Sequence, residues 1–267
     1  MRLQLDRLGS TLHFAAKKVS PVSALKPLVL LDLRCEQCPV RHHAVCAALG
    51  GSNLNELADM MIHRHFCAGD EIFHQEETSQ LFAVIVSGVV KLTRTFPDGR
   101  EQIVGLLTTA HSLGDVYSGM SHNNVECVTD VEVCCFKRTQ FETVLQRHPE
   151  LERRLSHDVQ EDLNEAQDWL MVLGRMGAKE KLATFLLWLC KDYGSHCANV
   201  AGRESNPIIH LPFKREEIAG FLGMTIETVS RKFGSLSSMG FISLIDSKTI
   251  EILDIEALRE IAQSCDF

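Results

Sequence analysis

Long apolar runs are absent from this 267-residue sequence. The longest one near the start, PLVLL at residues 27–31, is far shorter than the roughly 20 residues that cross a bilayer. No apolar core followed by a small-residue cleavage site is readable either, so no signal peptide is expected. These two absences predict a cytoplasmic protein.

The sequence also lacks the motifs of common catalytic sites. It shows no glycine loop that would cradle a phosphate and no nucleophile–base motif. Internal repeats and low-complexity tracts are missing, and the 45% apolar and 23% charged residues are an ordinary globular mixture. We therefore expect two ordinary domains or one large one, and no enzymatic activity.

The net charge of −8 at first argues against a nucleic-acid partner, but the charge is unevenly distributed. Residues 177–250 hold nine Lys and Arg against seven Asp and Glu, whereas the rest of the chain holds eighteen and twenty-eight. Charges close to the phosphates dominate DNA affinity. A locally basic C-terminal third is therefore compatible with DNA binding.

Turns and short strands follow a short N-terminal helix. Residues 53–63 (NLNELADMMIH) predict the helix, and residues 67–141 have the texture of strands, clearest at 83–86, 89–95 and 102–107. Pro97-Asp98-Gly99 predicts a hairpin, because proline presets φ and glycine accepts a positive φ. The spacing predicts a small antiparallel barrel or sandwich.

Residues 150–173 predict a helix of about 24 residues, because they contain neither proline nor glycine and Pro149 suits a first turn. Apolar and small residues recur at alternating steps of three and four, which is the pattern of a coiled-coil seam. The seam residues are Ser156, Val159, Leu163, Ala166, Leu170 and Leu173. A homodimer is the favoured interpretation; the alternative is that the seam packs on the protein's own barrel.

Residues 215–233 (REEIAGFLGMTIETVSRKF) predict two helices joined by a sharp turn. Ala219 is small enough for a second helix to cross closely above it. Gly223 suits the left-handed position that ends the first helix, and Thr225 can cap the second. Two strand-like segments, 242–245 and 249–253, follow as a wing.

The second of these helices places Glu227, Ser230 and Arg231 on one outward face. A helix-turn-helix inserts such a face into the major groove, where arginine donates to guanine and glutamate accepts from cytosine. The alternative is an ordinary surface helix with a Glu–Arg ion pair. The combination of turn, cap and wing favours DNA binding.

Ten cysteines in a cytoplasmic protein point to metal or redox chemistry rather than to a disulfide framework. Cys35, Cys38 and Cys46 are spaced so that their sulfurs can converge on one metal centre, iron–sulfur or zinc. His42 or His43 could complete a zinc site. Candidates for a fourth thiolate are Cys67, Cys127, Cys134 and Cys135, whereas core or surface roles suit Cys190, Cys197 and Cys265.

Residues 83–117 and 215–231 resemble the β-roll and the helix-turn-helix of the CRP/FNR superfamily, and the similarity extends over about 35–258. It implies an α+β fold with an N-terminal antiparallel β-roll (a cyclic-nucleotide-binding-like jelly roll), a long dimerisation helix and a C-terminal winged helix-turn-helix. The implied parts are a flexible extension (1–34), a cluster-binding segment with the β-roll sensor (35–148), the dimerisation helix (149–176) and the DNA-binding domain (177–267).

The cysteine spacing resembles the FNR branch and its FnrL-like members, which respond to oxygen through a [4Fe-4S] cluster. In that branch the fourth ligand precedes an FET segment and the helix-opening proline; here 141–143 and Pro149 match, which selects Cys134. Cys135 would point to the opposite face of the strand. The branch also implies that Glu227, Ser230 and Arg231 read a TTGAT-N4-ATCAA-like palindrome, with Arg231 on its guanine.

Two departures from the superfamily pattern stand out. Residues 114–129 contain no Arg or Lys to hold a nucleotide phosphate, so no cyclic nucleotide is expected. The seam carries Ala166 where FNR proteins place an aspartate, and Asp162 lies on a neighbouring row, so oxygen need not separate the subunits fully.

The resemblance predicts a homodimeric, oxygen-sensing transcription regulator, mainly an activator that works with RNA polymerase. Two alternatives remain open. One keeps the DNA-binding module and replaces the sensor with zinc, a thiol switch or a nitric-oxide sensor. The other is an electron-transfer enzyme, which would need a substrate or second-cofactor site.

Overall fold

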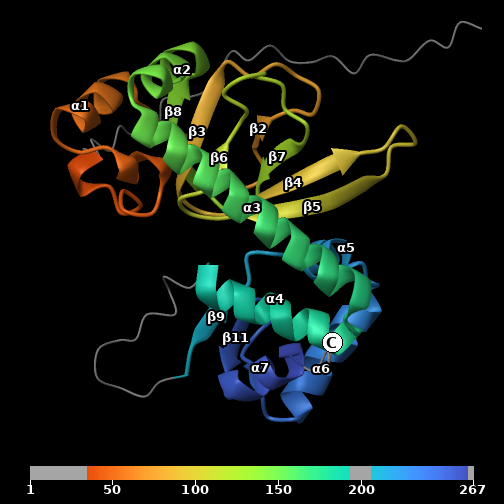
Figure 1. The fold of residues 1–267 in the computed structure, drawn as a ribbon. Coiled ribbons are helices and arrows are strands. Elements are labelled where there is room, and N and C mark those ends of the chain that lie inside the picture. Colours follow the sequence, from red (N-terminus) through yellow and green to blue (C-terminus); the bar gives the residue numbers. More distant parts are fainter. Residues whose placement is uncertain (1–34, 193–205, 264–267) are drawn as a thin grey trace, which may run out of the picture. The chain divides into compact units, whose positions relative to one another are not determined.

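The computed structural model describes residues 35–192 and 206–263 (Figure 1). The expected extension, 1–34, lies outside the described residues, as do Cys197 and Cys265. Within the described ranges, no helix is long and apolar enough to cross a membrane. The resolved elements confirm an α+β fold with strands first, a long helix next and a winged helix-turn-helix last.

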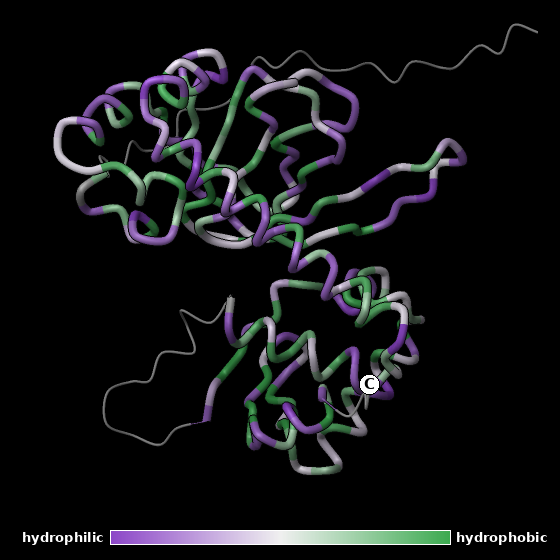
Figure 2. The backbone as a smooth tube through the Cα atoms, viewed as in Figure 1, coloured by the Kyte–Doolittle hydropathy of each residue, from purple (hydrophilic) through white to green (hydrophobic). Residues whose placement is uncertain are grey.

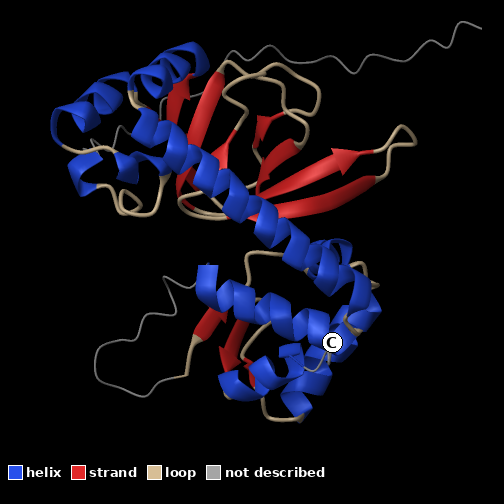
Figure 3. Ribbon diagram, in the orientation of Figure 1, coloured by secondary structure: helices blue, strands red, loops and turns tan. Residues whose placement is uncertain are grey.

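Two four-stranded antiparallel sheets form the β-roll (Figure 3). One sheet has the order β1 (Ile62–Phe66), β8 (Val131–Lys137), β3 (Leu81–Ser87) and β6 (Ser112–Leu113). The other has the order β2 (Glu71–Phe73), β7 (Asn124–Cys127), β4 (Val90–Thr95) and β5 (Glu101–Leu107). The predicted hairpin joins β4 to β5, with Gly99 at φ 83° and the Phe96 amide donating to the Arg100 carbonyl at 2.8 Å.

The central strands β3 and β8 of the first sheet pack on both faces. Inward residues such as Ile85 and Val133 meet residues of the second sheet, including Phe73 and Val125. Outward residues such as Val84 pack beneath a helical layer. That layer consists of η1 (Cys35–Gln37), η2 (Val45–Ala48), α1 (Gly51–Met60) and α2 (Arg138–Arg147).

The long helix α3 runs over Pro149–Arg175, with proline in its first turn as predicted. Hydrophilic and hydrophobic residues alternate along it (Figure 2), because only one side faces the protein's own core. Leu151, Leu155 and Val172 are the buried residues of this helix. The start of α3 thus belongs to the sensor core, and its end approaches the DNA-binding domain.

The C-terminal domain begins with α4 (Ala178–Asp192) and contains a three-stranded sheet of order β10, β11, β9. Its strands and remaining helices are β9 (Ile208–His210), α5 (Arg215–Leu222), α6 (Ile226–Ser238), β10 (Ile242–Leu244), β11 (Thr249–Ile252) and α7 (Ile255–Gln263). The predicted wing is the β10–β11 hairpin, which confirms a winged helix-turn-helix.

The core of the C-terminal domain extends into the β-roll. Val89 and Leu106 of the β-roll are buried in the same apolar cluster as the helices of the C-terminal domain. Lys91 of β4 adds a polar link, because its Nζ lies 2.8 Å from Glu126 and 2.9 Å from Glu217 of α5. Sensor and DNA-binding module are therefore joined by side chains as well as by the helix between them.

Two local predictions were wrong. The first helix stops at Met60, because residues from Ile62 pair with β8 and strand pairing overrides the helical pattern. The strand-rich region ends at Lys137, where α2 begins and buries Phe141, Val144 and Leu145 at helical spacing. Sequence analysis did not predict β9, which adds an edge strand to the wing sheet.

Candidate functional site

Strand β8 separates its two neighbouring cysteines onto opposite faces. Cys135 is buried between the two sheets, together with Val133. Cys134 lies on the outer face, opposite Val84 of β3, and packs against the helical layer. This arrangement agrees with the alternation expected of a strand and leaves Cys134 available to the N-terminal segment.

The N-terminal cysteines pack against the same outer face. Cys35, Cys38 and Cys46 are all half-buried and lie against the apolar cluster that also contacts Cys134. Short-range hydrogen bonds shape their loop: the Cys38 amide donates to the Cys35 carbonyl at 3.4 Å, and the Cys46 thiol donates to the Arg41 carbonyl at 3.9 Å. The structure thus gathers the four cysteines chosen from the sequence on one face of the β-roll.

Burial and the neighbouring cysteines disfavour ionisation of Cys35, Cys46 and Cys134. Burial, together with the nearby Cys38 and Cys35, raises the pKa of the Cys46 thiol to about 11. Burial and the same neighbours raise the pKa of Cys134 above its ordinary value. Four clustered thiolates need a bound cation to offset this repulsion, which is the behaviour of a metal-binding donor set. The donor set therefore fits a thiolate-ligated metal group.

The sulfurs are spaced more widely than zinc requires. Tetrahedral zinc with four thiolates brings the sulfurs to about 3.8 Å, because each Zn–S bond is about 2.3 Å. In the described part of the chain, three ligand atoms lie within 4.8 Å of one another at His157, Asp158 and Glu161, whereas the cysteines form no such group. His42 and His43 are exposed. The four cysteines are therefore candidate ligands of either a zinc ion or a larger iron–sulfur centre.

The other candidates for a fourth thiolate lie elsewhere. Cys67 is exposed at the end of β1, and Cys127 is buried between the sheets. Burial, together with the Asp70 and Glu126 carboxylates, raises the pKa of Cys127 to about 12. Burial raises the pKa of Cys135 to about 11. Cys190, on α4, packs against the DNA-binding core, which is consistent with a core role.

The helix-turn-helix is built as its sequence predicts. Gly223 ends α5 in the left-handed conformation, with φ 63° and ψ 42°. Thr225 caps α6 by accepting the Thr228 amide at 3.2 Å. The Arg215 guanidinium stacks on the Phe233 ring, 3.4 Å from its centroid, and ties the start of α5 to the middle of α6.

The outward face of α6 is open to a partner. Glu227, Ser230 and Arg231 are all exposed, whereas Val229 and Phe233 are buried on the opposite side. The Thr225 side chain and a backbone hydrogen bond lower the pKa of Glu227, so its carboxylate is an acceptor near neutral pH. The three side chains can therefore approach base edges without any rearrangement of α6.

The seam on α3 is uncovered by the chain's own residues. Val159 is 57% exposed, Leu163 49% and Leu170 69%, and Ala166 is also exposed. These values argue against the alternative that the seam packs on the barrel. Leu173 differs, because it is half-buried and contacts the core of the DNA-binding domain.

Hydrogen bonds within the loop after β6, and from Arg138 of α2, stabilise its conformation. Asp115 accepts the Ser118 amide and hydroxyl at 3.1 and 2.5 Å. Arg138, from α2, donates to the Val116 carbonyl at 3.1 Å, and a Cβ on Gly119 would lie 2.8 Å from its Nε. Arg138 lies outside residues 114–129, and only the tertiary fold brings it to this loop, so the sequence of the loop did not reveal it.

Comparison with known families matches two domains of this chain. The cyclic nucleotide-binding domain family matches residues 63–148, and the Crp-like helix-turn-helix domain family matches residues 180–261. The two matches together contain the β-roll, α2 and the winged domain, and the helix α3 lies between them.

Individual relatives extend this similarity over most of the chain. "Transcriptional activator protein FnrL" of Cereibacter sphaeroides is 36% identical over 229 residues, which cover 85% of this chain and 91% of that protein. "Nitrogen fixation regulation protein FixK" of Bradyrhizobium diazoefficiens is 35% identical, covering 84% and 93%. The solved structure of FixK2 from Bradyrhizobium japonicum matches with a TM-score of 0.67 and 25% identity, covering 77% of this chain and 99% of that one.

Proposed function

The chain belongs to the CRP/FNR family of DNA-binding transcription regulators, and from that premise we propose that it is a homodimeric, oxygen-responsive transcription activator. It is a regulator and not an enzyme. The observation that carries the oxygen response is the convergence of Cys134 with Cys35, Cys38 and Cys46 on one face of the β-roll. Relatives whose names describe activators support activation rather than repression.

The proposed cofactor is a [4Fe-4S] cluster held by Cys35, Cys38, Cys46 and Cys134. When bound, such a cluster supplies an oxygen-labile iron–thiolate centre. With all four thiolates engaged, the loop that carries Cys35, Cys38 and Cys46 is anchored to β8. Loss of the cluster in air would release these thiols and remove the anchor of the loop.

The anchored loop touches the dimerisation helix directly. Arg154 of α3 donates to the His43 carbonyl at 2.5 Å, and His43 lies between two of the proposed ligands, Cys38 and Cys46. Arg154 also pairs with Asp158 at 2.7 Å on the same helix. The thiolate site can therefore bias the position of α3, which is the two-state element that the proposal needs.

The proposed dimer sets the DNA geometry. Pairing of two α3 seams would place two α6 helices one turn of DNA apart, on a palindrome resembling TTGAT-N4-ATCAA. Glu227, Ser230 and Arg231 would read each half-site, with Arg231 on its guanine. RNA polymerase is the expected partner of a promoter-bound activator. We expect no cyclic nucleotide, because Arg138 already serves the loop carbonyls.

A visible spectrum is expected to test the sensor first. Protein purified without oxygen should be brown, and admitting air should bleach the band or change its shape, because iron–thiolate charge transfer absorbs visible light. Metal and sulfide analysis of the same sample is the control. A colourless protein that also fails to assemble a cluster from iron and sulfide would leave a zinc, thiol-redox or nitric-oxide sensor on the same DNA-binding module.

Leu163→Glu is expected to abolish dimerisation. Like charges facing across an interface cost several kcal/mol, so the dimer dissociation constant should rise by about 100-fold or more. Sedimentation of the anoxic protein measures it. Met171→Glu is the matched control, because Met171 is also 49% exposed on α3 but lies outside the seam. Equal behaviour of the two variants would place the dimer contact elsewhere.

A further inference from the structure

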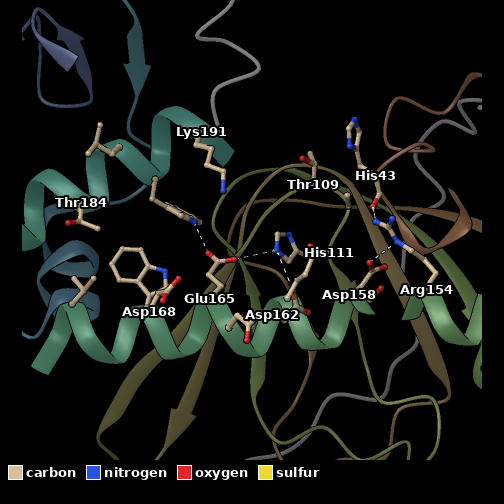
Figure 4. A pocket seen from close by; sticks show the side chains of 18 residues that line it. His43, Thr109, His111, Arg154, Asp158, Asp162, Glu165, Asp168, Thr184 and Lys191 are labelled. Carbon is tan, nitrogen blue, oxygen red and sulfur yellow. Dashed lines mark hydrogen bonds and ion pairs between the residues drawn. The ribbon is translucent and has the colours of Figure 1, made fainter. Parts of the chain in front are cut away.

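A cavity of about 690 Å³ lies between the β5–β6 loop, the middle of α3 and the helix α4 (Figure 4). Its α3 residues, such as Asp162 and Glu165, lie off the seam. Trp169 and Trp188, the two tryptophans of the chain, both line it. Neither the thiolate site nor the recognition face uses these side chains, so their arrangement needs a separate explanation.

His111 sits in this cavity between acceptors. Its Nδ1 lies 3.2 Å from the Thr108 carbonyl, and its Nε2 lies 3.6 Å from Asp162 and 3.9 Å from Glu165. A carbonyl and a carboxylate can only accept hydrogen bonds, so both ring nitrogens face acceptors. Only the protonated imidazole can donate from both nitrogens at once. The positions of these acceptors therefore favour the protonated, imidazolium form of His111.

Glu165 also contacts the DNA-binding domain. Its Oε1 accepts a hydrogen bond from Trp188 Nε1 of α4 at 2.9 Å, while its Oε2 faces His111. Trp188 stacks on Phe185, a fully buried residue of the DNA-binding core. A loop of the sensor, the helix α3 and the helix α4 thus meet at one carboxylate.

Acidic side chains around the cavity favour the protonated form of His111. Burial lowers the pKa of His111, but Glu165 and Asp162 together raise it above its ordinary value. The neighbouring His111 lowers the pKa of Glu165. The remaining charged or titratable groups that line the cavity are His43, Arg154, Asp158, Glu161, Asp168 and Lys191. Acidic groups outnumber basic ones around the imidazole.

The loop that carries His111 is tied to the strand that carries Cys134. Cys134, Val84 and Ser112 are register partners across β8, β3 and β6, and Ser112 lines the cavity. The Ile85 amide donates to the His111 carbonyl at 3.0 Å. Ala110, just before His111, is held at φ 72° and packs against the apolar cluster of the cysteines. A shift at Cys134 would therefore reach His111 through two strands.

We propose that His111 is a positioning residue that couples the sensor to the DNA-binding domain. Its imidazolium is held by Asp162 and Glu165, and Glu165 in turn holds Trp188, so docking of α4 depends on the protonation of His111. This inference rests on the proposed function only where it concerns DNA affinity. It adds a proton-dependent input to the same DNA-binding domain.

The direction of the pH dependence follows from the raised pKa. A group whose pKa is raised in the docked arrangement stabilises that arrangement fully below its undocked pKa of about 6.5. The stabilisation is lost as the pH rises through the docked pKa. The recognition face of α6 is exposed in the docked arrangement. DNA affinity should therefore fall as the solution becomes alkaline.

Tryptophan fluorescence of the full chain, kept anoxic and without DNA, tests the bridge itself. Because both tryptophans line the cavity, their emission should titrate with a midpoint above about 6.5. His111→Gln keeps a donor but cannot titrate in this range, so it should remove the transition. His74→Gln is the matched control, since His74 is exposed and pairs with Glu71 on β2. Loss of the transition in His74→Gln, or its survival in His111→Gln, would overturn the proposal.

Glu165→Gln provides a second variant should His111→Gln fold poorly. Its amide oxygen still accepts from Trp188, but the negative charge beside His111 is gone. The fluorescence midpoint should therefore shift to lower pH. An unchanged midpoint would show that the observed titration does not belong to the His111–Glu165 pair and would overturn the proposal.

DNA affinity supplies the last readout. His111→Ala should bind the palindrome about fivefold more weakly at low pH, the lower end of typical couplings, whereas His111→Gln should bind nearly normally with a flat pH profile. Native-like pH dependence in His111→Gln would contradict the coupling. Failure of the palindrome to bind any variant, with the fluorescence titration intact, would instead count against the proposed DNA site and leave the bridge standing.

Discussion

Replacing Cys134 by alanine is expected to abolish stable iron binding, whereas replacing Cys135 by alanine should leave it intact. Cys134 faces the cysteines of the N-terminal loop, and Cys135 faces the core between the two sheets. Removing one of the four thiolates would leave one iron without its protein ligand, so the Cys134→Ala protein should lose the anoxic visible band and most of its iron. Iron and sulfide analysis of both variants measures the effect.

The two variants control each other, because they sit next to each other on one strand. Cys135→Ala removes a buried thiol and should lower the free energy of unfolding by about 1 kcal/mol, while Cys134→Ala should fold normally. Full iron in Cys134→Ala together with loss of iron in Cys135→Ala would reverse the ligand assignment. Loss of iron in both would mean that the strand, rather than one thiol, supports the site.

Arg231→Ala is expected to weaken DNA binding and to relax discrimination at one base pair. An arginine that reads guanine through two hydrogen bonds contributes about 1–3 kcal/mol, which corresponds to roughly a fivefold to 150-fold loss of affinity. Binding to the palindrome should fall by at least this factor, because the homodimer loses one such contact in each half-site, whereas a duplex with the guanine changed should lose much less. Fluorescence anisotropy at fixed salt measures both.

Arg259→Ala is a suitable control for Arg231→Ala. Arg259 is also exposed, but it lies on α7 and pairs with Glu256. Its loss changes the net charge equally without touching the face of α6. An Arg231→Ala protein that retained its preference for the guanine, or a control that lost as much specificity, would remove the base-reading role.

Local rules predicted the parts of the fold that local chemistry decides. Gly223 and Thr225 end and start helices through their own backbone and hydroxyl groups, so both were readable from the sequence. Cys134 and Cys135 fall on opposite faces because strands alternate. The strand assignment of the β4–β5 hairpin also followed from alternation and the Pro-Asp-Gly turn.

Tertiary contacts explain what the sequence did not predict. The residues from Ile62 onward continue a helical pattern but pair with β8, and only the partner strand decides the outcome. Arg138 reaches the loop after β6 from a different element. His111 and Glu165 are far apart in sequence and ordinary in local context, so no spacing signals that they meet in one cavity.

The shared core between Val89, Leu106 and the C-terminal helices limits how this regulator can be recombined. A winged domain separated from the β-roll would expose an apolar surface, and Glu217 would lose its ion pair with Lys91. A chimera that joins this DNA-binding domain to the sensor domain of another protein would therefore have to retain the β4–β5 hairpin. The natural unit of exchange is thus larger than the segment that reads DNA.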